Sequence, residues 1–157
     1  MDRDIRSVAV SSDGVRVPIA LRRVKEIAVR VLRSERIGAA LISIAFVGRR
    51  TIATLNRKHL GHRGPTDVIS FGFGETVSRQ PVRGAPAVIG DIYIAPEIAG
   101  ENARRFGVPV REEIARLVIH GTLHVIGHDH PDGDERVLSA MWRRQEALLR
   151  RLVAVTT

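Results

Sequence analysis

Hydrophobic and polar residues follow two spacings along the chain, and these spacings predict four strands and five helices. Apolar stretches rich in β-branched residues indicate strands at residues 5–10, 39–47, 67–73 and 87–95. Apolar residues spaced three and four apart indicate helices at residues 18–32, 49–60, 96–106, 110–126 and 134–153. Between them, residues 11–14 form a turn cluster, and residues 74–86 a loop or hairpin tip.

The order of these elements predicts an α+β fold in a single domain that covers residues 1–157. A small mixed sheet of four strands packed with about five helices buries the apolar faces, and 157 residues suit one core better than two. The strand at 39–47 reads as buried, and Gly90 in the last strand indicates a bulge or a close backbone approach. The helix at 110–126 has no charged residue from position 117 onward, which predicts burial on most sides.

Composition and charge narrow the classes of protein. There is no cysteine, so a metal would have to bind to histidine or carboxylate side chains, and the cytoplasm is the expected location. No apolar run reaches the length of a membrane span, and the first residues do not resemble a signal peptide. The formal charge of +8, from 25 basic and 17 acidic residues, makes RNA or another polyanion a candidate partner. A surplus of arginine that only aids solubility is the alternative.

Four of the six histidines fall within the stretch HGTLHVIGHDH at residues 120–130. His120 and His124 are four residues apart on the predicted helix, so both imidazoles can reach one zinc ion. Gly127 suits the left-handed end of a helix, after which His130 can return toward the same ion. A lone histidine on an apolar helix is more often a hydrogen-bonded core residue, but two buried imidazoles without a shared cation would each need separate partners. The pattern therefore predicts a zinc site at the end of the long helix.

The third ligand is chosen between two histidines. His128 lies four residues after His124 but directly past Gly127, so His130 has more reach toward the ion and is preferred. Asp129 is expected either to orient a ligand imidazole through its other ring nitrogen or to serve the turn. Three histidine ligands leave a fourth tetrahedral position for chemistry, which is typical of catalytic zinc sites.

The same spacing also matches the zinc-protease pattern H-E-x-x-H-x-x-G-x-x-H. Gly121 stands where those proteases carry the glutamate that acts as general base. A zinc hydrolase of peptides or small molecules is therefore the second choice for the function.

Three motifs, in order, resemble the YbeY family of bacterial zinc-dependent endoribonucleases, which take part in ribosomal RNA maturation. HGTLHVIGHDH resembles the signature of that family, and LNRKHLGHRGPTDVISF at residues 55–71 is similar to its L-N-x-x-[YF]…P-T-D-V-[LI]-S-F segment. IGDIYIAPE at residues 89–97 is similar to its G-D-I strand. The resemblance implies one zinc ion held by His120, His124 and His130, and single-stranded ribosomal RNA as substrate. It also implies the ribosomal subunit or its assembly proteins as partners.

The sequence departs from the family pattern at two places. Many members carry an arginine directly after the aromatic residue of the L-N segment, whereas this chain has His59 followed by Leu60, and His128 replaces the usual tyrosine before the final Asp-His. Arg63, His59 and His62 are therefore the candidate catalytic residues, as positive groups for the charge that develops on the phosphorane. Each has an alternative as a solvated loop residue.

Structural roles are expected for other polar residues near these motifs. Thr66 and Ser70 are expected to satisfy backbone or outer ligand groups, with a phosphate or the zinc-bound water as the alternative. Asp67 and Asp91 are expected to be strand-end carboxylates. The aspartates at positions 132 and 134 are expected to begin the last helix.

Two mechanisms remain open for RNA cleavage at such a site. Zinc lowers the pKa of bound water toward about 7 and so activates it, or it polarises a phosphoryl oxygen while the ribose 2′-OH attacks. With only four Phe, one Tyr and one Trp, phosphate contacts should dominate over a broad stacking surface. Strong salt dependence and weak sequence preference are then expected. A ribosome-assembly factor with a structural zinc is the remaining alternative.

Overall fold

Nine helices and strands make up the part of the chain that the computed structural model describes, residues 5–73, 88–130 and 139–154. The strands are β1 (Ile5–Ser12), β2 (Ala39–Phe46), β3 (Val68–Phe73) and β4 (Val88–Ile94). The helices are α1 (Leu21–Ser34), α2 (Arg49–Leu60), α3 (Pro96–Phe106), α4 (Val110–Ile126) and α5 (Ala140–Ala154). Within these ranges, no helix is long and apolar enough to cross a membrane.

The four strands form one mixed sheet in the order β1-β2-β4-β3. β1 pairs with β2, and β2 with β4, in parallel, whereas the consecutive strands β3 and β4 pair antiparallel. Strand β3 is therefore an edge strand that runs against its neighbours. This arrangement confirms the predicted α+β fold with a small mixed sheet in a single domain.

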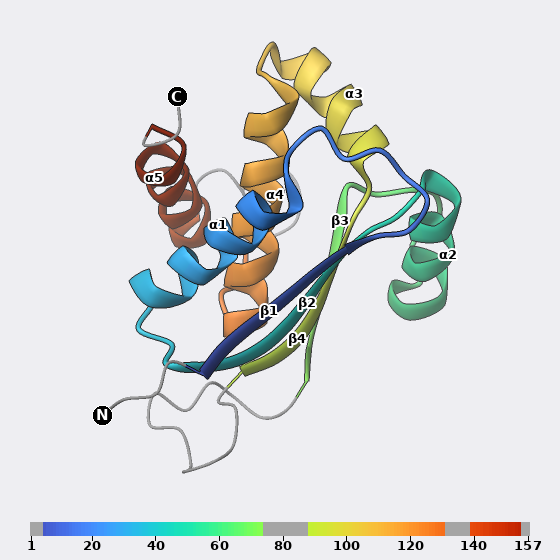
Figure 1. Cartoon of the computed structure of the whole chain (residues 1–157). Helices are drawn as coiled ribbons and strands as arrows, with labels where there is room; N and C mark the ends of the chain where they lie inside the picture. Colours follow the sequence, from blue (N-terminus) through green and yellow to red (C-terminus); the bar gives the residue numbers. More distant parts are fainter. Residues whose placement is uncertain (1–4, 74–87, 131–138, 155–157) are drawn as a thin grey trace.

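One face of the sheet carries most of the core. Helices α1 and α4 pack on it, and α5 lies against α4 (Figure 1). Buried side chains of β2 and β4, such as Ile42, Phe46 and Ile92, meet Ile27 of α1 and Leu123 of α4 in one cluster. The opposite face carries a smaller cluster, with α2 packed over one end of the strands. The long helix α4 is buried from Leu117 onward except at its two histidines, as predicted.

The strand at 39–47 is buried on one face only, so the prediction of a buried strand was wrong for the other face. Leu41 is 50% exposed, and the sheet register places it beside Ile89, which in turn pairs with the exposed Phe73. Because α2 covers only one end of this face, the other end has no helix over it among the described residues.

Several predicted ends of elements differ from the structure, most of them by one or two residues. β1 continues to Ser12, through half of the predicted turn cluster, and α1 begins at Leu21, because Ala20 still has extended dihedral angles. α5 begins at Ala140, where the Ser139 hydroxyl accepts a hydrogen bond from the Trp142 backbone N–H at 3.1 Å. The helix start predicted around positions 132 and 134 lies outside the described residues.

Two glycines allow α4 to pack closely on the sheet. A Cβ at Gly121 would lie 2.8 Å from Cγ2 of Ile92, and a Cβ at Gly90 would lie 2.7 Å from Cγ2 of Val125 and 2.9 Å from the Phe71 carbonyl oxygen. Contacts that short are not tolerated, so both positions require glycine for steric reasons. The predicted close backbone approach at Gly90 is confirmed, and the packing fixes the height of α4 above β4.

Candidate metal centre

Three histidines converge at the C-terminal end of α4. His120 and His124 project from the same side of the helix, and His130 comes from the segment that follows it. One ring nitrogen from each lies within 4.8 Å of those of the other two, and the ring centroids are 4.7 to 5.0 Å apart. Nitrogens that share one zinc ion at about 2.1 Å are at most about 4.2 Å apart. Small side-chain movements would therefore bring the three nitrogens to distances at which they can bind one ion. The set of donors therefore fits a divalent metal that prefers imidazole ligands.

The end of α4 explains how His130 returns to the helix. Gly127 takes a left-handed conformation, with φ of 116°, and its N–H donates to the His124 carbonyl oxygen at 3.0 Å. The N–H of His128 donates to the Leu123 carbonyl oxygen at 3.0 Å, which completes a Schellman-type end. Asp129 accepts a hydrogen bond from the backbone N–H of His130 at 2.8 Å, which supports the turn role.

His128 points to a different partner. Its Nε2 lies 3.6 Å from a carboxylate oxygen of Glu35 at the end of α1, and the other oxygen of Glu35 accepts a hydrogen bond from Arg144 at 2.8 Å. His128 thus connects the turn after α4 to α1 and α5. The geometry favours His130 as the third ligand, in agreement with the preference from the sequence.

Gln145 on α5 fixes the tautomer of His120, a role that the sequence did not reveal. Its Nε2 donates to Glu146 at 3.0 Å, which turns Oε1 toward His120, where Nδ1 lies 2.6 Å away. The Nδ1 of His120 therefore carries the proton, and Nε2 keeps a lone pair for a metal. The sequence signal for this role is a polar residue within the apolar stripe of α5, between Met141 and Leu148. In the structure Gln145 is 1% exposed.

A charged network holds this glutamine in place. Arg116 of α4 donates to both oxygens of Glu146, at 3.0 and 3.2 Å, and to Glu113 at 2.9 Å. Burial raises the pKa of Glu113, and the positive charge of Arg116 opposes that effect. Because the network joins α4 to α5, the position of Gln145 depends on both helices.

We expect Gln145→Leu to weaken metal binding by about 10- to 100-fold, because the imidazole of His120 loses its orienting acceptor. Gln145→Glu combined with Glu146→Gln keeps an acceptor for His120 and a donor–acceptor pair between residues 145 and 146, so it should retain most of the affinity. Competition with a chromophoric zinc chelator measures both dissociation constants. Equal affinities of Gln145→Leu and the unmodified protein would contradict this role.

Burial lowers the pKa of His124 below its usual value of 6.5, and His130 nearby acts in the same direction. The neutral form, which is the one that binds metals, is thus favoured in the folded chain.

Metal-free protein is therefore expected to lose stability as the pH falls below the ordinary histidine value of 6.5. In the unfolded chain His124 takes up a proton near pH 6.5, whereas in the folded chain it does so only at lower pH. The stabilisation present above pH 6.5 is therefore lost as the pH falls through the folded-state pKa. Chemical unfolding of chelated protein at about pH 7.5 and about pH 5.5 measures the loss. His124→Asn should show a smaller difference between the two pH values, and an equal difference would contradict the assignment.

The structure does not bring Arg63, His59 and His62 into the three-histidine group. His59 is exposed at the end of α2, and its ring packs edge-on against Phe71 with centroids 5.4 Å apart. Phe71 belongs to the smaller cluster, on the face of the sheet away from α4. His62 and Arg63 are exposed in the loop that follows, which the buried Asn56 holds through a 2.9 Å hydrogen bond to the Gly64 carbonyl oxygen.

Ser70 and Asp67, two of the polar residues near the motifs, lie on the side of the sheet that carries α4. Ser70 of β3 pairs directly with Ile92, which faces Gly121, so Ser70 lies on the same face as α4. Asp67 accepts hydrogen bonds from Asn102 at 3.1 Å and from Thr66 at 3.4 Å, just before β3.

Asp91 occupies the middle of β4, not a strand end, so its predicted position was wrong. The register pairs it with Ser43 of β2 and with Phe71 of β3. Alternation along β4 places it on the face away from α4.

Comparison with known proteins gives a consistent set of relatives. The family model described as Endoribonuclease YbeY matches residues 11–153. A protein named Endoribonuclease YbeY from Geobacter sulfurreducens is 34% identical over 148 residues, which is 94% of each chain. A protein of the same name from Syntrophus aciditrophicus is 31% identical over 94% of this chain and 90% of its own.

A solved structure has the same fold. The solution structure of TM1509 from Thermotoga maritima superposes with a TM-score of 0.65 and 27% sequence identity. The match covers 95% of this chain and 91% of that one.

Proposed function

Because the chain belongs to the YbeY family of endoribonucleases, we propose that it hydrolyses single-stranded RNA at one zinc ion held by His120, His124 and His130. The observation that carries this proposal is the convergence of three imidazole nitrogens within 4.8 Å of one another inside the region that the family model matches. The proposed activity belongs to one domain spanning residues 1–157.

The chain's own groups prepare the site. A bound zinc ion supplies a Lewis acid that activates water or polarises a phosphoryl oxygen. The hydrogen bond from His120 to Gln145 orients one ligand, and burial keeps His124 neutral. The tight turn at Gly127 brings His130 back to the helix. These features bring the three ligands close together before metal or substrate binds.

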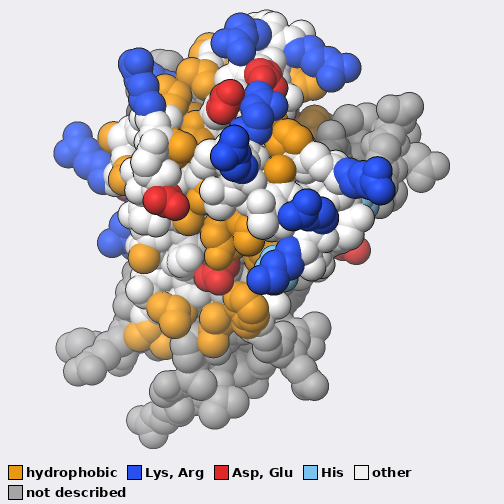
Figure 2. Space-filling model, turned by 90° about the vertical axis from the view of Figure 1, so that its right-hand side faces the viewer, with side chains coloured by type: hydrophobic (Ala, Val, Ile, Leu, Met, Phe, Trp, Pro, Cys, Tyr) orange, Lys and Arg blue, Asp and Glu red, His pale blue; other side chains and the backbone are white. Residues whose placement is uncertain are grey.

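The surface charge suits a polyanionic substrate. The chain carries a formal charge of +8, and Lys and Arg side chains are more widespread than Asp and Glu on the face shown in Figure 2. We assign His59, His62 and Arg63 to the substrate-binding surface, where they bind the RNA backbone as it crosses edge strand β3 toward the site. Their exposure and their position beside β3 support such a role.

The natural substrate in this proposal is ribosomal RNA, with the ribosomal subunit or its assembly proteins as partners in the cytoplasm. With four Phe, one Tyr and one Trp, the chain can contact few bases, so the surrounding ribonucleoprotein would select most of the cleavage site.

Incubation of the zinc-loaded protein with three substrates tests the proposed function: a single-stranded RNA, its duplex and casein. We expect cleavage of the single strand, much slower cleavage of the duplex, and no cleavage of casein. The affinity for RNA should fall steeply with added salt, because each phosphate that is neutralised releases counterions. Cleavage of casein without cleavage of RNA would contradict the proposal.

A further inference from the structure

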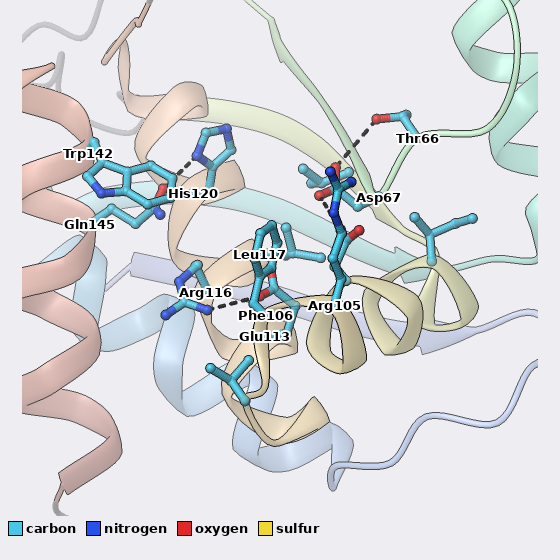
Figure 3. A pocket seen from close by; sticks show the side chains of 14 residues that line it. Thr66, Asp67, Arg105, Phe106, Glu113, Arg116, Leu117, His120, Trp142 and Gln145 are labelled. Atoms are coloured by element: carbon cyan, nitrogen blue, oxygen red, sulfur yellow. Dashed lines mark hydrogen bonds and ion pairs between the residues drawn. The ribbon is translucent and has the colours of Figure 1, made fainter. Parts of the chain in front are cut away.

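A cavity of about 730 Å³ lies directly beside His120. It is bounded by the segment that leads into β3 and by helices α3, α4 and α5 (Figure 3). Trp142 and His120 lie on one side of it, whereas Arg105, Asp67 and Thr66 lie on the other. From these surroundings we infer that the cavity binds one base of the RNA next to the cleaved phosphate, and that it prefers a base with an exocyclic amino group.

Two flat groups at the end of α3 offer a stacking surface. Phe106 is 65% exposed, although it is a large apolar ring, and it lines the cavity. The guanidinium carbon of Arg105 lies 5.9 Å from the centre of that ring. Trp142, from α5, also lines the cavity. Aromatic rings and stacked arginines are the groups on which unpaired bases stack in proteins that bind single strands.

The charge inside the cavity favours a neutral base over a phosphate. Its two arginines, Arg105 and Arg116, are matched by the carboxylates of Asp67 and Glu113. Arg116 is already engaged, since it donates hydrogen bonds to Glu113 and to Glu146. The phosphate is instead expected at the three histidines, where a bound metal supplies positive charge.

A fixed carboxylate provides the preference among bases. Asn102 and Thr66 each donate a hydrogen bond to Asp67, which holds the carboxylate at the cavity wall. A carboxylate has about four lone-pair sites, so it can also accept a hydrogen bond from a base. Adenine, cytosine and guanine present exocyclic amino groups, whereas uracil has none and presents a carbonyl oxygen where cytosine has its amino group. Adenine and cytosine should therefore bind better than uracil.

The size and position of the cavity agree with this use. Sites for small molecules in proteins have volumes of about 300 to 1,000 Å³. His120 lines the cavity and belongs to the metal-ligand group, so a base in the cavity places its phosphate near the site. The inference rests on the proposed function, because it assumes that the ligand is part of an RNA substrate.

Fluorescence of Trp142, the single tryptophan of the chain, tests the inference on the purified full-length protein. The probes are adenosine, cytidine and uridine, which have no phosphate that a metal could bind. We expect saturable quenching by adenosine and cytidine, with uridine binding at least about 10-fold more weakly. Phe106→Ala should weaken adenosine binding by about 10-fold or more, because base stacking on an aromatic ring is lost. Asp67→Asn should remove the preference over uridine.

Phe73→Ala is the matched control, since Phe73 is 53% exposed at the far end of β3 and does not line the cavity. It should bind adenosine as the unmodified protein does. Equal binding of the three nucleosides, or unchanged binding by Phe106→Ala, would overturn the inference. Nucleosides have no phosphodiester bond, so their binding is independent of cleavage. Selective binding of adenosine and cytidine without RNA cleavage would contradict the proposed function alone. RNA cleavage without selective nucleoside binding would contradict the inference alone.

Discussion

His124→Ala is expected to purify with little or no zinc and to cleave single-stranded RNA about 1,000-fold more slowly, or not at all. Removing one of three imidazoles leaves two ligands for the ion, and a catalytic metal contributes several kcal/mol to transition-state stabilisation. The metal content by mass spectrometry and the rate of RNA cleavage should fall together.

His128→Ala is the matched control for this prediction. It removes a histidine four residues away whose ring lies near Glu35 and is not one of the three converging ligands. The variant should keep its zinc and most of its cleavage rate. If His124→Ala instead lost stability and zinc but cleaved RNA at the original rate, the metal would be structural, and the role of the protein in RNA processing would rest on binding.

Gly121→Glu, which completes the zinc-protease motif, is expected to destabilise the fold by more than about 3 kcal/mol and to give no peptidase activity. A Cβ at this position would meet Ile92 Cγ2 at 2.8 Å. Overpacking of this kind costs about 1–3 kcal/mol, and burial of an unpaired carboxylate adds a further penalty. The added side chain would point at the sheet and not at the metal. Urea unfolding and a casein assay measure the two outcomes.

Smaller changes separate steric from electrostatic effects at this position. Gly121→Ala should cost about 1–3 kcal/mol from overpacking alone. Combining it with Ile92→Val, which removes one methyl group but leaves Cγ2 in place, should give little rescue, whereas Ile92→Ala should relieve the clash at the expense of a cavity. A stable Gly121→Glu variant with peptidase activity would overturn this account of the glycine.

The sequence predicted the fold and the three histidines because both depend on short-range patterns. Spacings of two and of three to four residues gave the strands and helices, and α2, α3 and α4 begin and end at the predicted residues. The spacing of His120 and His124 on one helix, with a glycine after them, gave two metal-ligand candidates and the turn that returns the third.

Contacts between distant elements were outside the reach of these patterns. Gln145 is 25 residues from His120 along the chain, and only the packing of α5 on α4 brings them together. The contact between His128 and Glu35 likewise depends on where α1 ends. The half-exposed Leu41 shows the same limit, because an apolar strand does not reveal which parts of its two faces a helix will cover.

The central claim is that three imidazoles hold one metal ion on which RNA cleavage depends. Its most direct test combines elemental analysis of the purified protein with cleavage of single-stranded RNA before chelation, after chelation and after return of zinc. About one zinc per chain, loss of cleavage on chelation and recovery with zinc are predicted. RNA cleavage that continues at the same rate after the metal has been removed from the protein would contradict the account.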